Sequence, residues 1–79
     1  MLYFTYVLKS TVDNKLYVGW TNNLRQRFES HNKGLVEATK HRRPLTLIYY
    51  EAGISKEKAI SREKYFKTGF GRRFLLSRI

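Results

Sequence analysis

The chain has 79 residues and no cysteine, so its length predicts one domain over residues 1–79, and disulfides and cysteine-ligated zinc are excluded. Sixteen lysines and arginines against six acidic residues give a formal net charge of +10 at pH 7, which favours a polyanionic partner, most often nucleic acid, over a basic surface kept for solubility. No apolar run approaches the ~18 residues of a membrane span and no segment resembles a signal peptide, so we expect a cytoplasmic protein without membrane contact.

The first twenty residues have the pattern of a β-hairpin. Residues 2–8 (LYFTYVL) and 16–20 (LYVGW) are rich in aromatic and branched side chains, as strands are. Asp13-Asn14 between them supplies turn chemistry. If the turn is centred near Val12, Tyr6 and Tyr17 are approximate cross-strand partners on one face of the sheet.

A helix and a third strand are expected next. Thr21 or Asn22 can cap a helix that runs to about Lys33, and Gly34 is suited to end it. The following residues, 35–43, are polar and irregular. Pro44 then precedes a strand over residues 45–51 (LTLIYYE).

Two further helices complete the pattern. Gly53 and Ser55 lead into a helix that runs to about Thr68 and that Gly69 would end, and a short last helix spans residues 72–78. The order is therefore ββαβαα. It predicts the α+β class, with a small three-stranded sheet, mixed or antiparallel, flanked by helices.

The first helix turns an arginine and a histidine toward its apolar side. Each helical residue advances by about 100°, so Leu24 and Phe28 define the buried stripe. His31 lies about 20° and Arg27 about 60° to the other side of Leu24, whereas Arg25 points away and is expected to be solvated.

The next helix does the same with a carboxylate. Glu63 lies about 40° from Ala59, between the positions of Phe66 and Ile60 on the apolar side. Burying an unpaired carboxylate would lower the stability of the fold by several kcal/mol. Glu63 is therefore expected either to bind a metal or to form a salt bridge, for instance with Arg27.

Two tyrosines would join these groups in a polar pocket. Tyr6 and Tyr17, on one face of the hairpin, would lie beside the arginine, the histidine and the carboxylate. Gly19, at the end of the second strand, would let the backbone of a ligand approach closely. Such a pocket is unfavourable for folding, which favours a chemical role for it.

Taken together, these residues resemble the GIY-YIG nuclease superfamily over nearly the whole chain. The first signature tripeptide of that family corresponds to Phe4-Thr5-Tyr6 and the second to Tyr17-Val18-Gly19. The similarity continues through Thr21-Asn22-Asn23-Leu24, Arg27, His31 and Ser61-Arg62-Glu63-Lys64. The chain is most similar to the small, single-domain, endonuclease-like bacterial members. It departs from the pattern at Phe4 and Thr5, where the family has Gly and Ile, and it has no asparagine after Asn32.

The resemblance implies hydrolysis of phosphodiester bonds in DNA with one divalent ion, Mg²⁺ or Mn²⁺, in a structure-specific or DNA-repair setting. Glu63 would be the only protein ligand of the ion. Arg27 would hold the scissile phosphate, and Tyr17 or Tyr6 would orient or deprotonate the attacking water. His31 would orient a tyrosine or the phosphate.

Two basic runs are candidates for contacts with a nucleic-acid backbone, although each is as readily explained as a solvated loop. They comprise Lys40, Arg42 and Arg43 before the third strand, and Arg72 and Arg73 before the last helix. Two other functions stay open. One is a non-catalytic nucleic-acid-binding protein of the same fold. The other is a subunit active only with a protein partner, since a chain this short has no second domain to choose a target.

Overall fold

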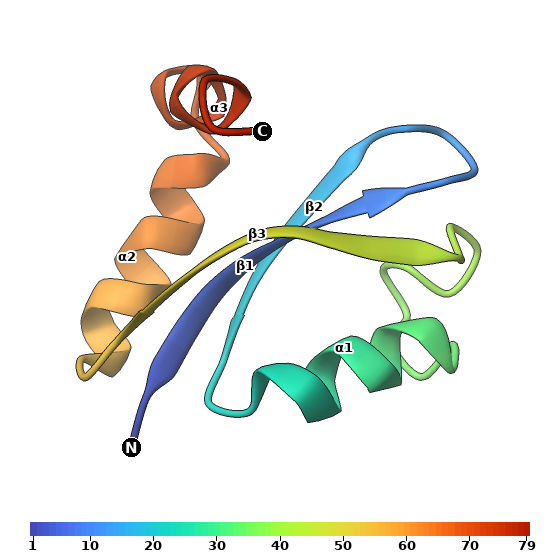
Figure 1. Cartoon of the computed structure of the whole chain (residues 1–79), viewed down its shortest axis with the longest axis horizontal. Helices are drawn as coiled ribbons and strands as arrows, with labels where there is room; N and C mark the ends of the chain where they lie inside the picture. The colour runs from blue at the N-terminus through green and yellow to red at the C-terminus, as the bar shows by residue number, and fades with distance from the viewer.

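The computed structural model describes all residues 1–79 (Figure 1). Its elements, in chain order, are β1 (Tyr3–Ser10), β2 (Leu16–Thr21), α1 (Leu24–Asn32), β3 (Leu45–Gly53), α2 (Lys56–Phe66) and α3 (Gly69–Leu76). The strands form one sheet in the order β2-β1-β3, and β1 pairs antiparallel with both neighbours. The expected α+β class and ββαβαα order are confirmed, and the sheet is wholly antiparallel. None of the helices has the length and apolar character to cross a membrane.

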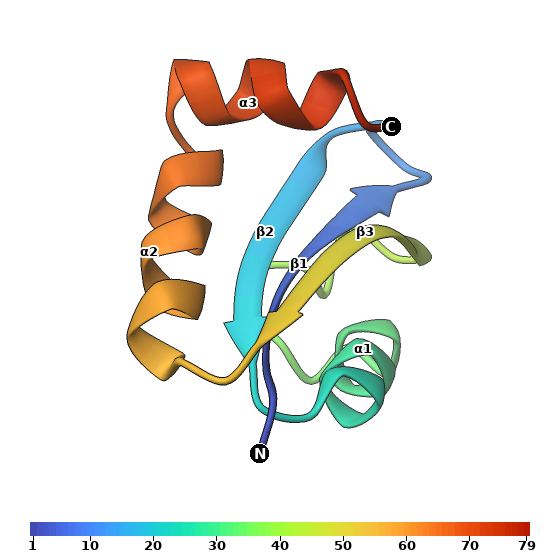
Figure 2. The ribbon, with the colours of Figure 1, turned by 60° about the vertical axis from the view of Figure 1, so that its left-hand side comes forward.

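The sheet separates α1 from the other two helices. Figure 2 shows α2 and α3 along one face of the sheet and α1 against the other. Successive side chains of β1 alternate between these faces, as strand geometry requires. Val7 packs with Val18, Phe66 and Leu75 on the side of α2 and α3. Residues of the opposite face form a second cluster, with Tyr6, Leu8 and Leu45 at its centre and Tyr17, Leu24, Phe28 and Leu47 around them.

Each helix begins at a side-chain cap, although not always where the sequence suggested. The Asn23 side chain accepts from the backbone N–H of Gln26, so the cap of α1 is neither Thr21 nor Asn22. Ser55 caps α2 in the same way, as expected. These caps satisfy backbone N–H groups that have no partner within the helix.

The prediction that Gly69 ends α2 was wrong. The helix ends at Phe66, and Thr68 caps α3, which begins at Gly69. The glycine that matters at this corner is Gly71, which is buried against the backbone of Tyr65 and Phe66, so that a side chain there would overlap the Tyr65 carbonyl group. The two helices can therefore fold tightly against each other.

The hairpin register also differs from the expected one. Tyr6 pairs with Gly19, and Tyr17 pairs with Leu8, so the two tyrosines are diagonal neighbours on one face and not direct partners. The turn spans residues 11–15, and within it Asn14 adopts a left-handed conformation with φ of 58°, which asparagine tolerates better than most residues. The two-residue shift places Tyr6 over a glycine.

Candidate active site

Tyr6 and His31 form a buried hydrogen-bonded pair at the centre of the α1 face. The Tyr6 side chain is 1% exposed and its hydroxyl lies 2.8 Å from His31 Nε2. The other ring nitrogen of His31, Nδ1, lies 2.7 Å from the hydroxyl of Thr39. His31 is fully buried, so both of its nitrogens are occupied by neighbours within the protein.

The surroundings keep both members of this pair neutral. Burial, together with the nearby charge of Arg27, lowers the pKa of His31 to about 4. Burial also raises the pKa of Tyr6; Arg27 opposes this rise, while Tyr17 and, least, Glu63 add to it. Of the two roles expected for His31, the structure supports orienting a tyrosine, because a fully enclosed ring cannot reach a phosphate.

Gly19 is required by Tyr6 and not by a ligand. A Cβ atom at Gly19 would lie 2.5 Å from the hydroxyl oxygen of Tyr6 and 2.6 Å from its ring. The expectation that a ligand backbone approaches at Gly19 was therefore wrong, since the ring of its cross-strand partner already fills that space. The glycine allows the Tyr6 hydroxyl to reach His31.

Tyr17 is the more accessible of the two tyrosines. Its ring meets the imidazole of His31 edge-on at a centroid distance of 5.1 Å, and the residue is partly exposed. It also lines a cavity of about 190 Å³ together with Lys67 and Arg72. Tyr17 is therefore better placed than Tyr6 to contact a molecule from solvent.

Arg27 lies on α1, one helical turn before His31. Its charge acts on both Tyr6 and His31, which places its guanidinium close to them. The residue is exposed, and none of the four ion pairs in the structure includes it. Arg27 therefore has no acidic partner, and its guanidinium opposes the rise in the pKa of the Tyr6 hydroxyl beside it; its role in a catalytic site stays a prediction.

Glu63 approaches the site from α2. Its side chain is only 20% exposed, and one carboxylate oxygen lies 3.5 Å from Nζ of Lys67, one helical turn further along. The salt-bridge partner suggested from sequence, Arg27, was wrong, because the partner one turn away on the same helix is closer at hand. The negative charge of Glu63 makes a small contribution to the raised pKa of Tyr6.

A divalent ion would find a single carboxylate here. No three histidine, cysteine or acidic side chains converge anywhere in the chain. That donor set does not suit zinc or a caged calcium ion. It does suit Mg²⁺, which is usually held by one or two carboxylates while water and substrate phosphates complete its shell. The exposed ammonium group of Lys67 is the cation that now neutralises Glu63.

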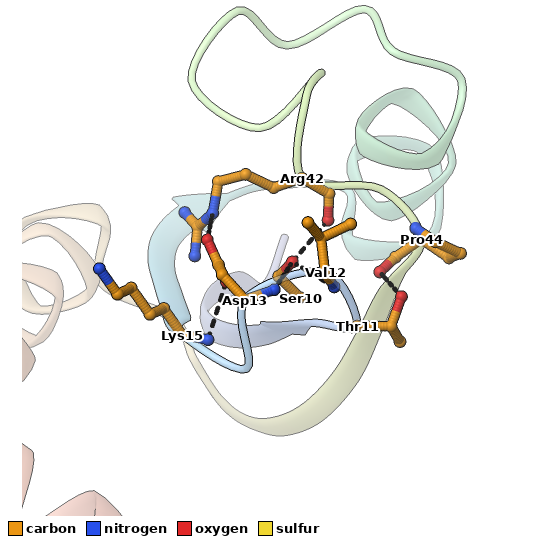
Figure 3. A network of polar contacts seen from close by, with 7 residues as sticks. All are labelled: Ser10, Thr11, Val12, Asp13, Lys15, Arg42 and Pro44. Carbon is orange, nitrogen blue, oxygen red and sulfur yellow. Dashed lines mark hydrogen bonds and ion pairs between the residues drawn. The ribbon is translucent and has the colours of Figure 1, made fainter.

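The first basic run is tied into the protein (Figure 3). Arg42 Nε donates to Asp13 at 3.1 Å, and Lys40 lies 3.1 Å from Glu37. Arg43 donates to the carbonyl oxygen of Lys40. The Arg42–Asp13 contact holds the loop before β3 against the β1–β2 turn, with further bonds from Ser10 to the carbonyl of Arg42 and from Thr11 to that of Pro44.

The second basic run is less constrained. Arg72 and Arg73 are exposed and form no ion pair, and Arg73 lies over the ring of Phe70 at 5.2 Å. Arg72 lines the same small cavity as Tyr17. Of the two candidate backbone-contact runs, the one at α3 is thus the one whose charges have no acidic partner.

Sequence reasoning missed the residues that hold α2 in place. Arg62 donates two hydrogen bonds to Glu51 at 2.8 and 2.9 Å, and Tyr49 donates to the same carboxylate at 2.8 Å. The signal was present in the spacing, because Arg62 lies one turn before Phe66 and Glu51 lies two residues after Tyr49. Thr39 was also missed, and nothing in the irregular segment around it marks it.

Known proteins share this sequence and arrangement. The GIY-YIG catalytic domain family matches residues 2–74. UPF0213 proteins from Clostridium perfringens and from Streptococcus pyogenes serotype M3 are each 45% identical over 65 residues, which are 81% of this chain and 69% and 70% of theirs.

A solved structure is also similar in fold. The solution NMR structure of a UPF0213 protein from Bacillus halodurans matches with a TM-score of 0.61 and 29% identity, over 98% of this chain and 84% of that one. With a family match over almost all of its length and relatives that share its fold, the chain belongs to the GIY-YIG catalytic domain family, a family of nucleases.

Proposed function

We propose that this chain is a metal-dependent endonuclease that hydrolyses phosphodiester bonds in DNA, in the cytoplasm and in a structure-specific or repair setting. The observation that carries the proposal is a convergence of unlike groups from three elements. The guanidinium of Arg27 on α1 and the largely buried carboxylate of Glu63 on α2 act electrostatically on the Tyr6–His31 pair, and the partly exposed phenol of Tyr17 on β2 contacts it. In a purely structural site Arg27 and Glu63 would be expected to form an ion pair, and here they do not.

Arg27 binds the scissile phosphate in this proposal. Its guanidinium is unpaired and can donate two parallel hydrogen bonds to phosphate oxygens. It remains charged throughout, so it also stabilises the additional negative charge that develops as the bond breaks. Arg72 and Arg73 contact neighbouring phosphates and add affinity without selecting a sequence.

Tyr17 orients the attacking water, and Tyr6 with His31 holds Tyr17 and Arg27 in position. The burial of Tyr6 and its raised pKa leave it a neutral hydrogen-bonding group. The edge-on contact between Tyr17 and His31 fixes the direction of the more exposed phenol. Glu63 would hold one Mg²⁺ or Mn²⁺ ion, which when bound supplies positive charge at the phosphate and its leaving oxygen.

The alternatives are a non-catalytic nucleic-acid-binding protein of this fold and a subunit that cuts only with a protein partner. In the loop at residues 40–43, Lys40 and Arg42 are paired with acidic residues, which leaves two fewer free charges for a non-catalytic nucleic-acid-binding surface. Both alternatives also leave Arg27 free to contact a phosphate, so cleavage by the isolated chain is the measurement that separates them from the proposal.

The test is a Glu63→Gln variant with Glu57→Gln as its matched control on the same helix. Glu57 is exposed at the start of α2, away from the site. Glu63→Gln should fold, because losing an ion pair with a half-exposed lysine costs about 0.3–0.5 kcal/mol. It should still bind DNA, and its Mg²⁺-dependent cleavage should fall at least ~1,000-fold, as when the charge that stabilises a transition state is lost.

Cleavage is measured on nicked, branched, duplex and single-stranded DNA with Mg²⁺ and again with a chelator. Glu57→Gln should cut like the parent. Cutting by Glu63→Gln at the parental rate would remove the metal site from the proposal. A parent chain that binds DNA and never cuts would favour the two non-catalytic or partner-dependent alternatives.

A further inference from the structure

The flank of α1 opposite Arg27 holds a groove that the proposed nuclease site does not use. It has a volume of about 540 Å³ and runs between the start of α1 and strands β1 and β3. Its lining comprises Phe4, Asn22, Asn23, Leu24, Arg25, Phe28, Leu47 and Tyr50. We call it the aromatic groove.

Aromatic surface in this groove is open to solvent. Tyr50 is 52% exposed, and its ring lies 6.1 Å from that of Phe4, tilted by 59°. Phe28 is partly buried below them, so the floor is apolar. Tyr50 is also the β3 partner of Tyr6 in the sheet, which ties its position to the buried pair of the active site.

The rim of the groove carries unused polar groups. Arg25 is exposed and belongs to none of the four ion pairs. Asn22 is exposed beside it at the start of α1. Asn23 uses its carbonyl oxygen to cap the helix, which leaves its NH₂ group to donate outward. The rim therefore offers a positive charge and amide groups beside aromatic faces.

We propose that the aromatic groove binds an unpaired nucleobase of the nucleic-acid substrate, an inference that rests on the proposed function. Every base has a π-face that can stack on an aromatic side chain, and proteins that bind single strands combine such stacking with basic residues. A base in a duplex is stacked between its neighbours, so only an unpaired or flipped base can enter. With a formal net charge of +10 on the chain, a polyanion is the complementary occupant.

The groove lies at a useful distance from the cutting site. The two are on opposite flanks of α1, and a helix with its side chains is about 10 Å across. At about 3.4 Å per stacked nucleotide, this separation corresponds to roughly three nucleotides. The substrate class is thus nucleic acid with an unpaired base a few nucleotides from the bond that is cut.

The experiment measures binding without cleavage. The probe is a short single-stranded oligonucleotide carrying 2-aminopurine, whose fluorescence falls when the base stacks, in the presence of a chelator. Tyr50→Ala should weaken binding of this oligonucleotide about 5- to 150-fold, the range for loss of one base–aromatic stack, and should abolish the fluorescence change. Binding of the matching duplex should change less than about twofold, because its bases stay stacked.

Two further variants keep the result interpretable. Phe70→Ala is the matched control, since Phe70 is 72% exposed on α3 and outside the groove. Tyr50→Phe keeps the ring and should bind like the parent, which separates loss of stacking from loss of folding. Equal weakening by Phe70→Ala, or equal weakening of single strand and duplex by Tyr50→Ala, would overturn the proposal.

Failure of the groove can be told apart from failure of the nuclease. Arg27→Ala should lose cleavage and keep the 2-aminopurine signal. If the parent never cuts and Tyr50 is still required for single-strand binding, the groove proposal holds and the nuclease proposal does not. Cleavage by a parent whose single-strand binding ignores Tyr50 gives the reverse result.

Discussion

Arg27 on α1 and Arg62 on α2 are both helical arginines that border the sheet, yet their surroundings are opposite. Arg62 forms a two-bond ion pair with Glu51, and its guanidinium lies 4.5 to 5.2 Å from the ring centres of Tyr65, Phe66 and Phe74. Arg27 has no acidic partner, although Glu63 is near enough for both to act on Tyr6. Arg62 thus has an acidic partner within the protein, and Arg27 has none.

The difference shows how the fold divides stability from chemistry. The face toward α2 and α3 joins an apolar cluster to a closed polar network of Arg62, Glu51 and Tyr49. The face toward α1 buries a neutral pair, Tyr6 and His31, and leaves the charged arginine beside it free. A charged side chain that binds substrate is expected to have no counter-charge within the protein.

The largest effect expected from breaking this comparison is on cleavage by Arg27→Ala. The rate should fall about 100- to 1,000-fold, as when one stabilising donor is removed from a transition state. The free energy of unfolding should change by less than about 0.5 kcal/mol, because Arg27 is exposed and unpaired. Denaturant unfolding and single-turnover cleavage at saturating substrate measure the two quantities.

Arg25→Ala is the control for that variant, two residues away on the same helix. At saturating substrate, where weaker binding at the groove rim no longer limits the rate, it should cut within about twofold of the parent, since its side chain lies on the other flank of α1. If both variants lose activity equally, the two flanks of α1 are not functionally distinct and the comparison fails.

The next effect is the pH dependence of stability, which tests whether His31 is neutral beside the charged Arg27. His31 has a pKa of about 4 in the folded chain, against about 6.5 when unfolded, so the unfolded state binds more protons between these values. Stability should therefore be complete above about pH 6.5 and fall as the pH is lowered toward 4, by up to about 3 kcal/mol. Urea unfolding at pH 7 and pH 4.5 measures it.

Variants separate this histidine from other titrating groups. His31→Gln cannot charge, so it should lose most of the pH dependence in that window, whatever its stability at pH 7. His41→Gln, at an exposed position, should keep the parental slope. An unchanged slope in His31→Gln would mean that the ring is not held neutral as the structure indicates.

The fold could be predicted from the sequence wherever the hydrophobic period is regular. The hairpin, β3 and both long helices were expected near their observed places, because aromatic and branched runs, Ser55 and the spacing of Leu24, Phe28 and His31 are local signals. The hairpin register was not predicted, because side chains alternate with a period of two, so a register shifted by two residues leaves each side chain on the same face. The end of α2 was missed because a capping threonine beside a glycine can equally close one helix or open the next.

The candidate site was predicted in part for the same reason. Helix periodicity placed Arg27, His31 and Glu63 on the inward sides of their helices. In the structure His31 bonds the Tyr6 hydroxyl, and the charges of Arg27 and Glu63 both affect the pKa of Tyr6. The partners of these groups were not predicted. Lys67, one helical turn from Glu63, could have been found from the i,i+4 spacing, whereas Thr39, which bonds the second ring nitrogen of His31, lies in an irregular segment that carries no such signal.

The smallest effect concerns Arg62, and it is the converse of the Arg27 result. Arg62→Ala removes both hydrogen bonds to Glu51 and the packing of the guanidinium on three rings. The pair is about one-third exposed, 36% for Arg62 and 30% for Glu51, so its loss should cost about 2 kcal/mol, between the values for surface and buried pairs. Arg62→Met keeps the packing and should cost about half as much, because only the polar bonds are lost.

Cleavage by either variant, measured well below its melting temperature, should stay within a few-fold of the parent. A variant of Arg62 that is as stable as the parent and does not cut would place this arginine in the site, and the division between a stabilising face and a chemical face would not hold.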